Sequence, residues 1–111
     1  MDSTLFNITL DELPRFIEEN PFAIVDFWNS DCSVCRILVP ELEKFALENL
    51  GFCAFAKLQV DDVREQVTER FGIKGGPVFI AFMDGVEVDR AVGFYGVKTF
   101  RWMKKLIDAA C

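Results

Sequence analysis

The chain has 111 residues, 51% of them hydrophobic, and its formal net charge at pH 7 is −6. This length and composition predict a single folded domain over residues 1–111 with a sizeable core, and they exclude a disordered chain. The acidic balance disfavours binding to nucleic acids or to anionic membrane surfaces. The chain has no run of about 18 apolar residues and no basic segment at its start, so we expect neither a membrane span nor a signal peptide.

The chain contains four cysteines and no histidine. The lack of histidine excludes Cys–His catalysis, Ser–His–Asp triads and zinc sites that contain histidine. A core of this size can hold a fold without disulfides, so we expect a cytoplasmic protein whose CxxC pair does redox or metal chemistry. We expect Cys53 to be a buried inert thiol on a strand, and Cys111 to be an exposed terminal thiol.

The first elements are a strand and a helix. Residues 4–8 are expected to form a short first strand. Residues 11–19 are expected to form a helix with Asp11 as its N-cap and Pro14 in its first turn, where the missing N–H of proline costs little.

The next strand and helix lie on either side of a polar turn. A nearly continuous apolar run over residues 23–28 predicts a strand that is covered on both faces, and only Asp26 interrupts it. After Cys32, apolar residues at helical spacing predict one helix that extends to about residue 49. Pro40 lies well inside this helix and should kink it.

The second half begins with a predicted strand at residues 52–60. Asp62 and Glu65 form a capping-box pattern for a short helix, which Gly72 should end. The remaining elements are two strands at 78–83 and 86–92, joined by the two-residue turn Asp84-Gly85, and a last helix at 97–110.

This order of elements predicts an α/β fold. Strands that alternate with helices pair in parallel, whereas the closing hairpin adds an antiparallel edge. We therefore expect a central mixed sheet of about five strands, flanked by four helices.

Cys32 and Cys35 are separated by two residues, at the predicted first turn of a helix. Unpaired backbone N–H groups and the helix dipole lower the pKa of a thiol at that position. Cys32, the exposed cysteine, would attack a target disulfide, and the inward-facing Cys35 would then attack Cys32 and release the reduced target. Two alternatives stay open, a purely structural pair and half of a zinc site that would also need Cys53 and Cys111.

The segment VDFWNSDCSVCRILVPELEKFA resembles the active-site segment of thioredoxins. The resemblance continues through AKLQVDD, FGIKGGPVFIAFMDG and RAVGF, in the expected order and spacing, and it covers nearly the whole chain. It implies the thioredoxin fold and dithiol–disulfide exchange. It further implies a monomer without bound cofactor or metal, which reduces protein disulfides and receives electrons from a partner reductase.

Several other residues match this family. Asp26 is a carboxylate inside an apolar strand, where desolvation should raise its pKa and suit it to proton exchange with Cys35; the alternative is a hydrogen-bonded core residue. Lys57 is similar to the lysine that lies near this carboxylate in thioredoxins, unless it is a solvated residue at a strand end. Pro77 matches the cis-proline of the family, and the backbone of the residue before it would pair with a bound peptide strand. The positions expected to contact a substrate are Trp28, Asp31, Ser33, Val34, Gly76, Pro77 and Gly93.

The sequence departs from the family around the dithiol. Asp31 replaces the aromatic residue that usually precedes the first cysteine, and its carboxylate should disfavour a Cys32 thiolate, an effect that Arg36 would partly offset. Ser33-Val34 replaces Gly-Pro between the cysteines. We therefore expect altered partner choice. Two further functions stay open, a dedicated electron carrier to a narrow set of targets and a binding or chaperone subunit with an incidental dithiol.

Overall fold

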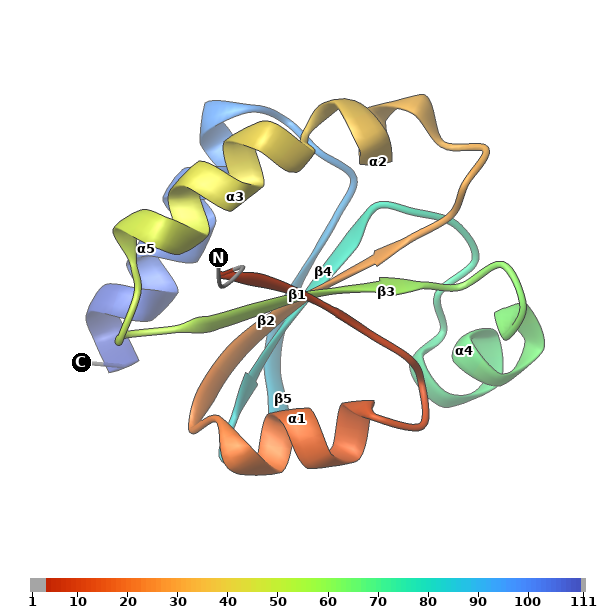
Figure 1. The fold of residues 1–111 in the computed structure, drawn as a ribbon, viewed down its shortest axis with the longest axis horizontal. Coiled ribbons are helices and arrows are strands. Elements are labelled where there is room, and N and C mark those ends of the chain that lie inside the picture. Colours follow the sequence, from red (N-terminus) through yellow and green to blue (C-terminus); the bar gives the residue numbers. More distant parts are fainter. Residues whose placement is uncertain (1–3, 111) are drawn as a thin grey trace.

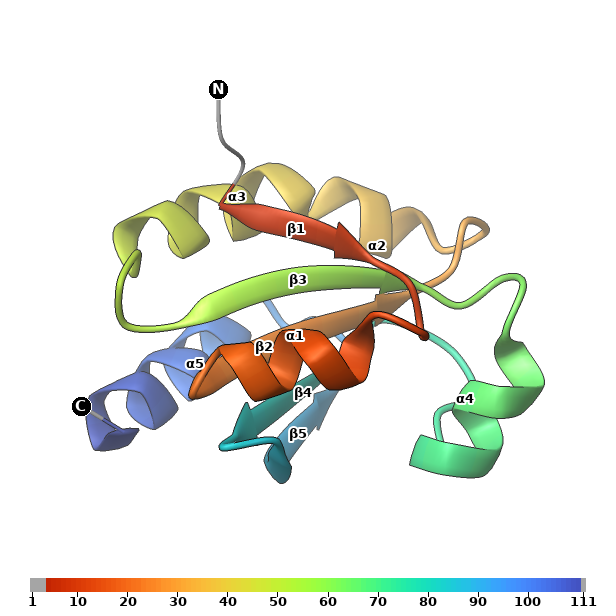
Figure 2. The same cartoon turned by 60° about the horizontal axis from the view of Figure 1, so that its bottom comes forward.

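The computed structural model describes residues 4–110, which form a mixed sheet between two layers of helices. The strands are β1 (Leu5–Ile8), β2 (Phe22–Trp28), β3 (Ala54–Gln59), β4 (Val78–Met83) and β5 (Val86–Val92). They lie in the order β1-β3-β2-β4-β5, which can be followed across the sheet in Figure 2. β1 and β2 are each parallel to β3, whereas β4 is antiparallel to β2 and to β5. The predicted five-stranded mixed sheet is thus confirmed.

The helices are α1 (Leu13–Glu19), α2 (Ser33–Ile37), α3 (Val39–Glu48), α4 (Arg64–Phe71) and α5 (Val97–Ala110). Figure 1 shows α3 and α5 on one face of the sheet, and α1 and α4 on the other. Two hydrophobic cores result. The first contains Leu42 of α3 and Met103 of α5, whereas the second contains Leu13 of α1 and Val67 of α4.

β2 is the central strand, and both faces of it are covered. Residues 22–27 are all buried, as the apolar run of this segment predicts. Side chains alternate between the two faces of a strand, so Ile24 packs in the first core while Val25 and Phe27 pack in the second. Asp26 therefore points to the same side as Ile24, the side that α3 and α5 cover.

The predicted helix from Cys32 to residue 49 is in fact two helices, so the structure contains five helices among its described residues instead of four. The break is at Leu38, between α2 and α3. Pro40 has no N–H to donate to the carbonyl of Arg36, so the hydrogen-bond ladder of α2 is interrupted there. Leu42 still donates to the carbonyl of Leu38, so the chain re-enters a helix at once.

Both predicted N-caps are wrong. Asp11 lies in a turn, and the helix start is instead closed by Thr9 and Glu12, each of which accepts a hydrogen bond at its side chain from the other's backbone N–H. This reciprocal pair is a capping box that begins at Thr9, two residues before the expected cap. At α4 the cap position is Val63, without a side-chain hydrogen bond, so Asp62 does not cap that helix.

Two turns follow the prediction. Gly72 ends α4 in the left-handed conformation, with φ of 71°. The β4–β5 hairpin turns at Asp84 and Gly85, which both have positive φ, as a two-residue hairpin with right-handed strand twist requires.

Cys53 does not lie on a strand, because β3 begins one residue later. Its backbone N–H donates to the carbonyl of Asn49 and closes a turn after α3, which keeps the residue out of the ladder. Cys53 is buried, as predicted. Cys111, which we expect to be an exposed terminal thiol, lies outside the described residues. Within residues 4–110, no helix is long and apolar enough to cross a membrane.

Candidate active site

The two cysteines of the CxxC pair lie where β2 passes into α2. Cys32 is the N-cap of α2 and Cys35 lies one turn later. The structure contains a disulfide between them, with Cα atoms 5.3 Å apart. Cys32 is partly exposed, whereas Cys35 is only 1% exposed. A bulky partner can therefore reach the sulfur of Cys32 but not that of Cys35.

A backbone N–H points at the sulfur of Cys32. The N–H of Cys35 donates to Cys32 Sγ over 3.2 Å. After reduction, the same N–H is placed to donate a hydrogen bond to a Cys32 thiolate, which favours the charged form of the sulfur. The short helix thus holds one partly exposed sulfur and one buried sulfur behind it.

Asp26 is buried in the central strand, with a relative exposure of 1%. Neither carboxyl oxygen has a hydrogen-bond partner among the described residues. Burial raises the pKa of Asp26 from its ordinary value of 3.8 to about 7, and the positive charge of Lys57 opposes part of that rise. An acid with a pKa near the ambient pH can both accept and donate a proton.

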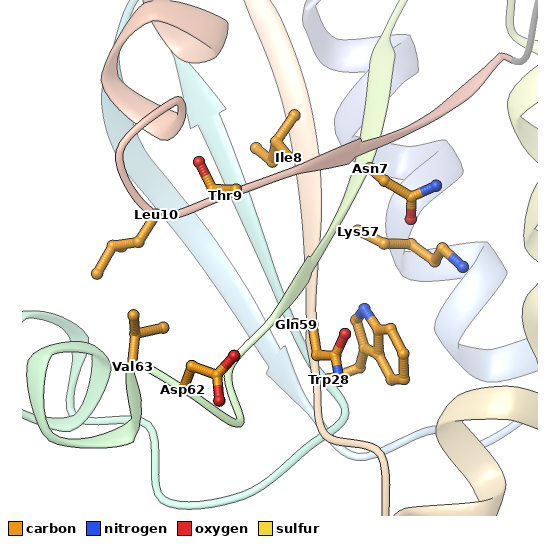
Figure 3. A pocket seen from close by; sticks show the side chains of 9 residues that line it. All are labelled: Asn7, Ile8, Thr9, Leu10, Trp28, Lys57, Gln59, Asp62 and Val63. Carbon is orange, nitrogen blue, oxygen red and sulfur yellow. The ribbon is translucent and has the colours of Figure 1, made fainter.

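Lys57 and Trp28 line a pocket beside Asp26. Lys57 is the register partner of Asp26 on the neighbouring strand. Its Nζ lies 5.4 Å from the centre of the Trp28 ring, and Figure 3 shows the two side chains next to each other. The pocket has a volume of about 370 Å³. Its other lining residues come from the ends of β1 and β3 and from the segments that follow these two strands.

The loop before β4 lies against the dithiol. The Gly76–Pro77 peptide bond is cis, and Cys32 Sγ lies 3.6 Å from the carbonyl oxygen of Gly76. Gly93 donates its N–H to the carbonyl of Pro77 over 2.7 Å, which joins the end of β5 to this loop. A methyl group on Gly93 would lie 3.1 Å from the ring of Tyr95, so the ring of Tyr95 flanks the loop. The structure brings Cys32, Gly76, Pro77 and Gly93 together.

On the other side of Cys32, Asp31 and Arg64 form a charged surface, which we call the charged rim. Asp31 is exposed and pairs with Arg64 of α4 over 3.4 Å. A hydrogen bond from the Asn29 side chain, together with Arg64, lowers the pKa of Asp31 below its ordinary value. Arg36 does not offset this charge by pairing with it, since its guanidinium donates to the carbonyl of Ser30.

Ser33 and Val34 lie on the first turn of α2, and both are exposed. Val34 presents 42% of its surface to solvent, which makes it an apolar contact beside Cys32. The exposed surface around the nucleophile therefore combines an apolar part and a charged part.

Sequence reasoning missed three residues of this site, Asn29, Arg64 and Tyr95. Asn29 is polar yet buried, at the end of an apolar strand, and that position could have marked it. Arg64 and Tyr95 carry no local signal. Arg64 is 33 residues from Asp31, and only the fold brings them together.

Comparisons with known proteins agree on one family. The family model described as Thioredoxin matches residues 5–105. A thioredoxin of Coprinus comatus is 35% identical over 86 residues, which cover 76% of this chain and 79% of that protein. A thioredoxin of Mycoplasma genitalium is 33% identical over 86 residues, which cover 78% and 82%.

Solved structures give the same result. A mutant thioredoxin from Halobacterium salinarum superimposes with a TM-score of 0.80 and 25% identity, and the match covers 99% of this chain and 94% of that one. A Plasmodium falciparum thioredoxin superimposes with a TM-score of 0.78 and 27% identity, over 96% and 99% of the two chains. With its CxxC pair joined as a disulfide at the start of α2, this chain belongs to the thioredoxin family and is a protein-disulfide oxidoreductase.

Proposed function

We propose that this protein reduces disulfides in a small set of protein partners, with Cys32 as the nucleophile. The observation that carries the role of Cys32 is the contrast in exposure between the two cysteines, since Cys32 is partly open to solvent and Cys35 is buried. The Cys32 thiolate attacks one sulfur of a target disulfide, forms a mixed disulfide and expels the other sulfur as a thiolate. Cys35 then attacks Cys32 Sγ, which releases the second target thiol and leaves the Cys32–Cys35 disulfide.

Asp26 serves the second step. Cys35 is buried, and a buried thiol resists ionisation, so it needs a nearby base before it can attack. Asp26 lies on the sheet face that faces α3 and α5, and α2 leads directly into α3. With a pKa of about 7, its carboxylate accepts the Cys35 proton and later returns it. Lys57 adjusts this pKa through its positive charge, and Trp28 packs against Lys57.

The target strand pairs with the backbone beside the cis peptide bond. Gly76, Pro77 and Gly93 form the surface next to Cys32, and an extended peptide laid on this surface presents its disulfide to the sulfur. Val34 and Ser33 contact the peptide from the α2 side. The protein acts as a monomer, and a reductase in the cytoplasm returns two electrons to the Cys32–Cys35 disulfide.

Asp31 narrows the choice of partners. Its carboxylate is exposed and ionised beside Cys32, and its charge is only partly balanced by an exposed Arg64. A partner surface that is acidic or strongly apolar at this contact loses affinity, because it meets a like charge or removes water from a charged carboxylate. Partners that offer a basic group there are favoured.

The proposal is tested by trapping with Cys35→Ser. This variant cannot resolve its mixed disulfides, so targets remain attached through Cys32. We expect a small set of trapped proteins from a cytoplasmic extract, whereas the matched control Cys32→Ser should trap none. Many unrelated targets would support a general reductase. No target at all, together with full activity of Cys32→Ser in its cellular role, would instead support a binding subunit with an incidental dithiol.

The rim is tested separately by the kinetics of reduction with a thioredoxin reductase. We expect slow reduction of the wild-type disulfide and faster reduction of Asp31→Trp. An ordinary rate for the wild type would contradict the role given to Asp31.

A further inference from the structure

The side chain of Asn29 connects the two segments that flank Cys32. Asn29 is 8% exposed and lies in the turn between β2 and α2. Its Oδ1 accepts a hydrogen bond from the N–H of Gly76 over 3.0 Å, across 47 positions of sequence. Its Nδ2 donates to the carboxylate of Asp31. One buried amide therefore holds both the cis-proline loop and the charged rim.

Gly76 lies close against the end of β2. A Cβ at this position would be 2.7 Å from the carbonyl oxygen of Phe27 and 3.1 Å from Asn29 Oδ1. The N–H of Gly76 donates to the buried side chain of Asn29, and the carbonyl oxygen of Gly76 lies 3.6 Å from Cys32 Sγ. The carbonyl faces the dithiol, whereas the N–H is already engaged.

We propose that Asn29 is a specificity-determining residue that withholds the Gly76 N–H from bound substrates. This inference rests on the proposed function, in which an extended peptide pairs with the backbone of Gly76. A backbone N–H makes one good hydrogen bond, so a peptide carbonyl gains this donor only by displacing Asn29 Oδ1. A small disulfide that needs no backbone pairing does not meet this competition.

The two bonds of Asn29 can be separated by substitution. Asn29→Ala removes both of them and frees the Gly76 N–H. Asn29→Asp keeps an oxygen that can accept from Gly76, but it has no N–H to donate to Asp31. Asn49→Ala is the matched control, because Asn49 is also buried and donates its Nδ2 to a backbone carbonyl, that of Phe45 at the end of α3.

The measured quantity is the ratio of kcat/KM for a disulfide-linked extended peptide to kcat/KM for a small uncharged disulfide, bis(2-hydroxyethyl) disulfide. This ratio cancels changes in the reactivity of Cys32 that act on both substrates. We expect Asn29→Ala to raise the ratio about fivefold, because the KM for the peptide falls. A fivefold change corresponds to ~1 kcal/mol, the contribution of the one hydrogen bond that no longer competes with the peptide. The ratio for Asn29→Asp and for Asn49→Ala should stay within about twofold of the wild type.

An unchanged or lower ratio in Asn29→Ala would overturn the inference, because Asn29 would then only stabilise the loop. Amide hydrogen exchange of the wild type gives a second test that needs no variant. The Gly76 amide should be protected in the free protein, and rapid exchange would remove the basis of the proposal. A wild type that reduces the small disulfide but not the peptide would refute the proposed function itself, and this inference with it.

Discussion

Replacing Asp26 by alanine should make the oxidised protein more stable at alkaline pH and change its stability little at acid pH. Asp26 has a pKa of about 7 in the fold, against 3.8 for the ordinary carboxyl. The folded state therefore holds a proton that the unfolded chain releases between these two values. Since the folded state binds more protons in this window, stability falls as the pH rises through it.

The size of the effect follows from the two pKa values. The full difference of about three units corresponds to roughly 4 kcal/mol at ~1.4 kcal/mol per unit, and it is reached only above the folded pKa. Between about pH 5 and about pH 8.5, the stability of the wild type should fall by about 3 kcal/mol relative to Asp26→Ala. The cavity left by the carboxyl group does not titrate. It therefore changes the free energy of unfolding of Asp26→Ala by the same amount at both pH values.

Urea unfolding of the oxidised protein at these two pH values measures the effect, with the free energy of unfolding obtained by linear extrapolation. Asp108→Ala is the matched control, because it also removes one carboxylate but from the exposed surface of α5. The free energy of unfolding of Asp108→Ala should stay within ~0.5 kcal/mol of the wild-type value at both pH values. A difference between Asp26→Ala and the wild type that does not change with pH would refute the raised pKa of Asp26.

Three more substitutions test other parts of the structure. Lys57→Met should raise the pKa of Asp26 above about 7, because it removes the charge that opposes the effect of burial. Carboxyl ¹³C NMR measures this pKa, and a lower value would contradict the electrostatic effect of Lys57 on Asp26. Gly76→Ala should cost about 1–3 kcal/mol in urea unfolding, because the new methyl group would meet a backbone carbonyl oxygen of β2 at 2.7 Å; an unchanged free energy of unfolding would contradict that contact. Thr9→Ala should cost ~1 kcal/mol by losing the cap, whereas the control Asp11→Ala should change stability by less than ~0.5 kcal/mol; equal effects would argue against the cap.

The features that could be predicted well from the sequence are those that depend on residues close together in the chain. The apolar run of β2 contains enough information to place a strand covered on both faces, and the carboxylate inside it is visible at once. The CxxC spacing similarly identifies the dithiol. Helix starts were harder, because several polar residues compete within a few positions. Thr9 and Asp11 can each cap a helix, and the outcome depends on which one Glu12 can reciprocate.

The features that the sequence did not predict depend on contacts between distant segments. Asp31 meets Arg64, and Asn29 meets Gly76, because the segments after β2 and β3 and before β4 end at the same edge of the sheet. The hydrophobic periodicity of the sequence does not predict these contacts, since each one joins single residues that lie far apart in the chain. The fold class could therefore be predicted, whereas the contacts that we propose to select substrates could not.

β2 joins the stability of the fold to its chemistry. The strand carries Asp26 in its buried middle and leads, through Asn29, into the helix that begins with Cys32. Above neutral pH the charged carboxylate weakens the fold, and no hydrogen bond from the described residues offsets this cost. A residue selected for packing alone at this position would be apolar, like its neighbours Val25 and Phe27. The proposed proton transfer to and from Cys35 would account for an ionisable group in the central strand. If Asp26 has this role, an Asp26→Ala variant that gains stability should resolve its mixed disulfides more slowly.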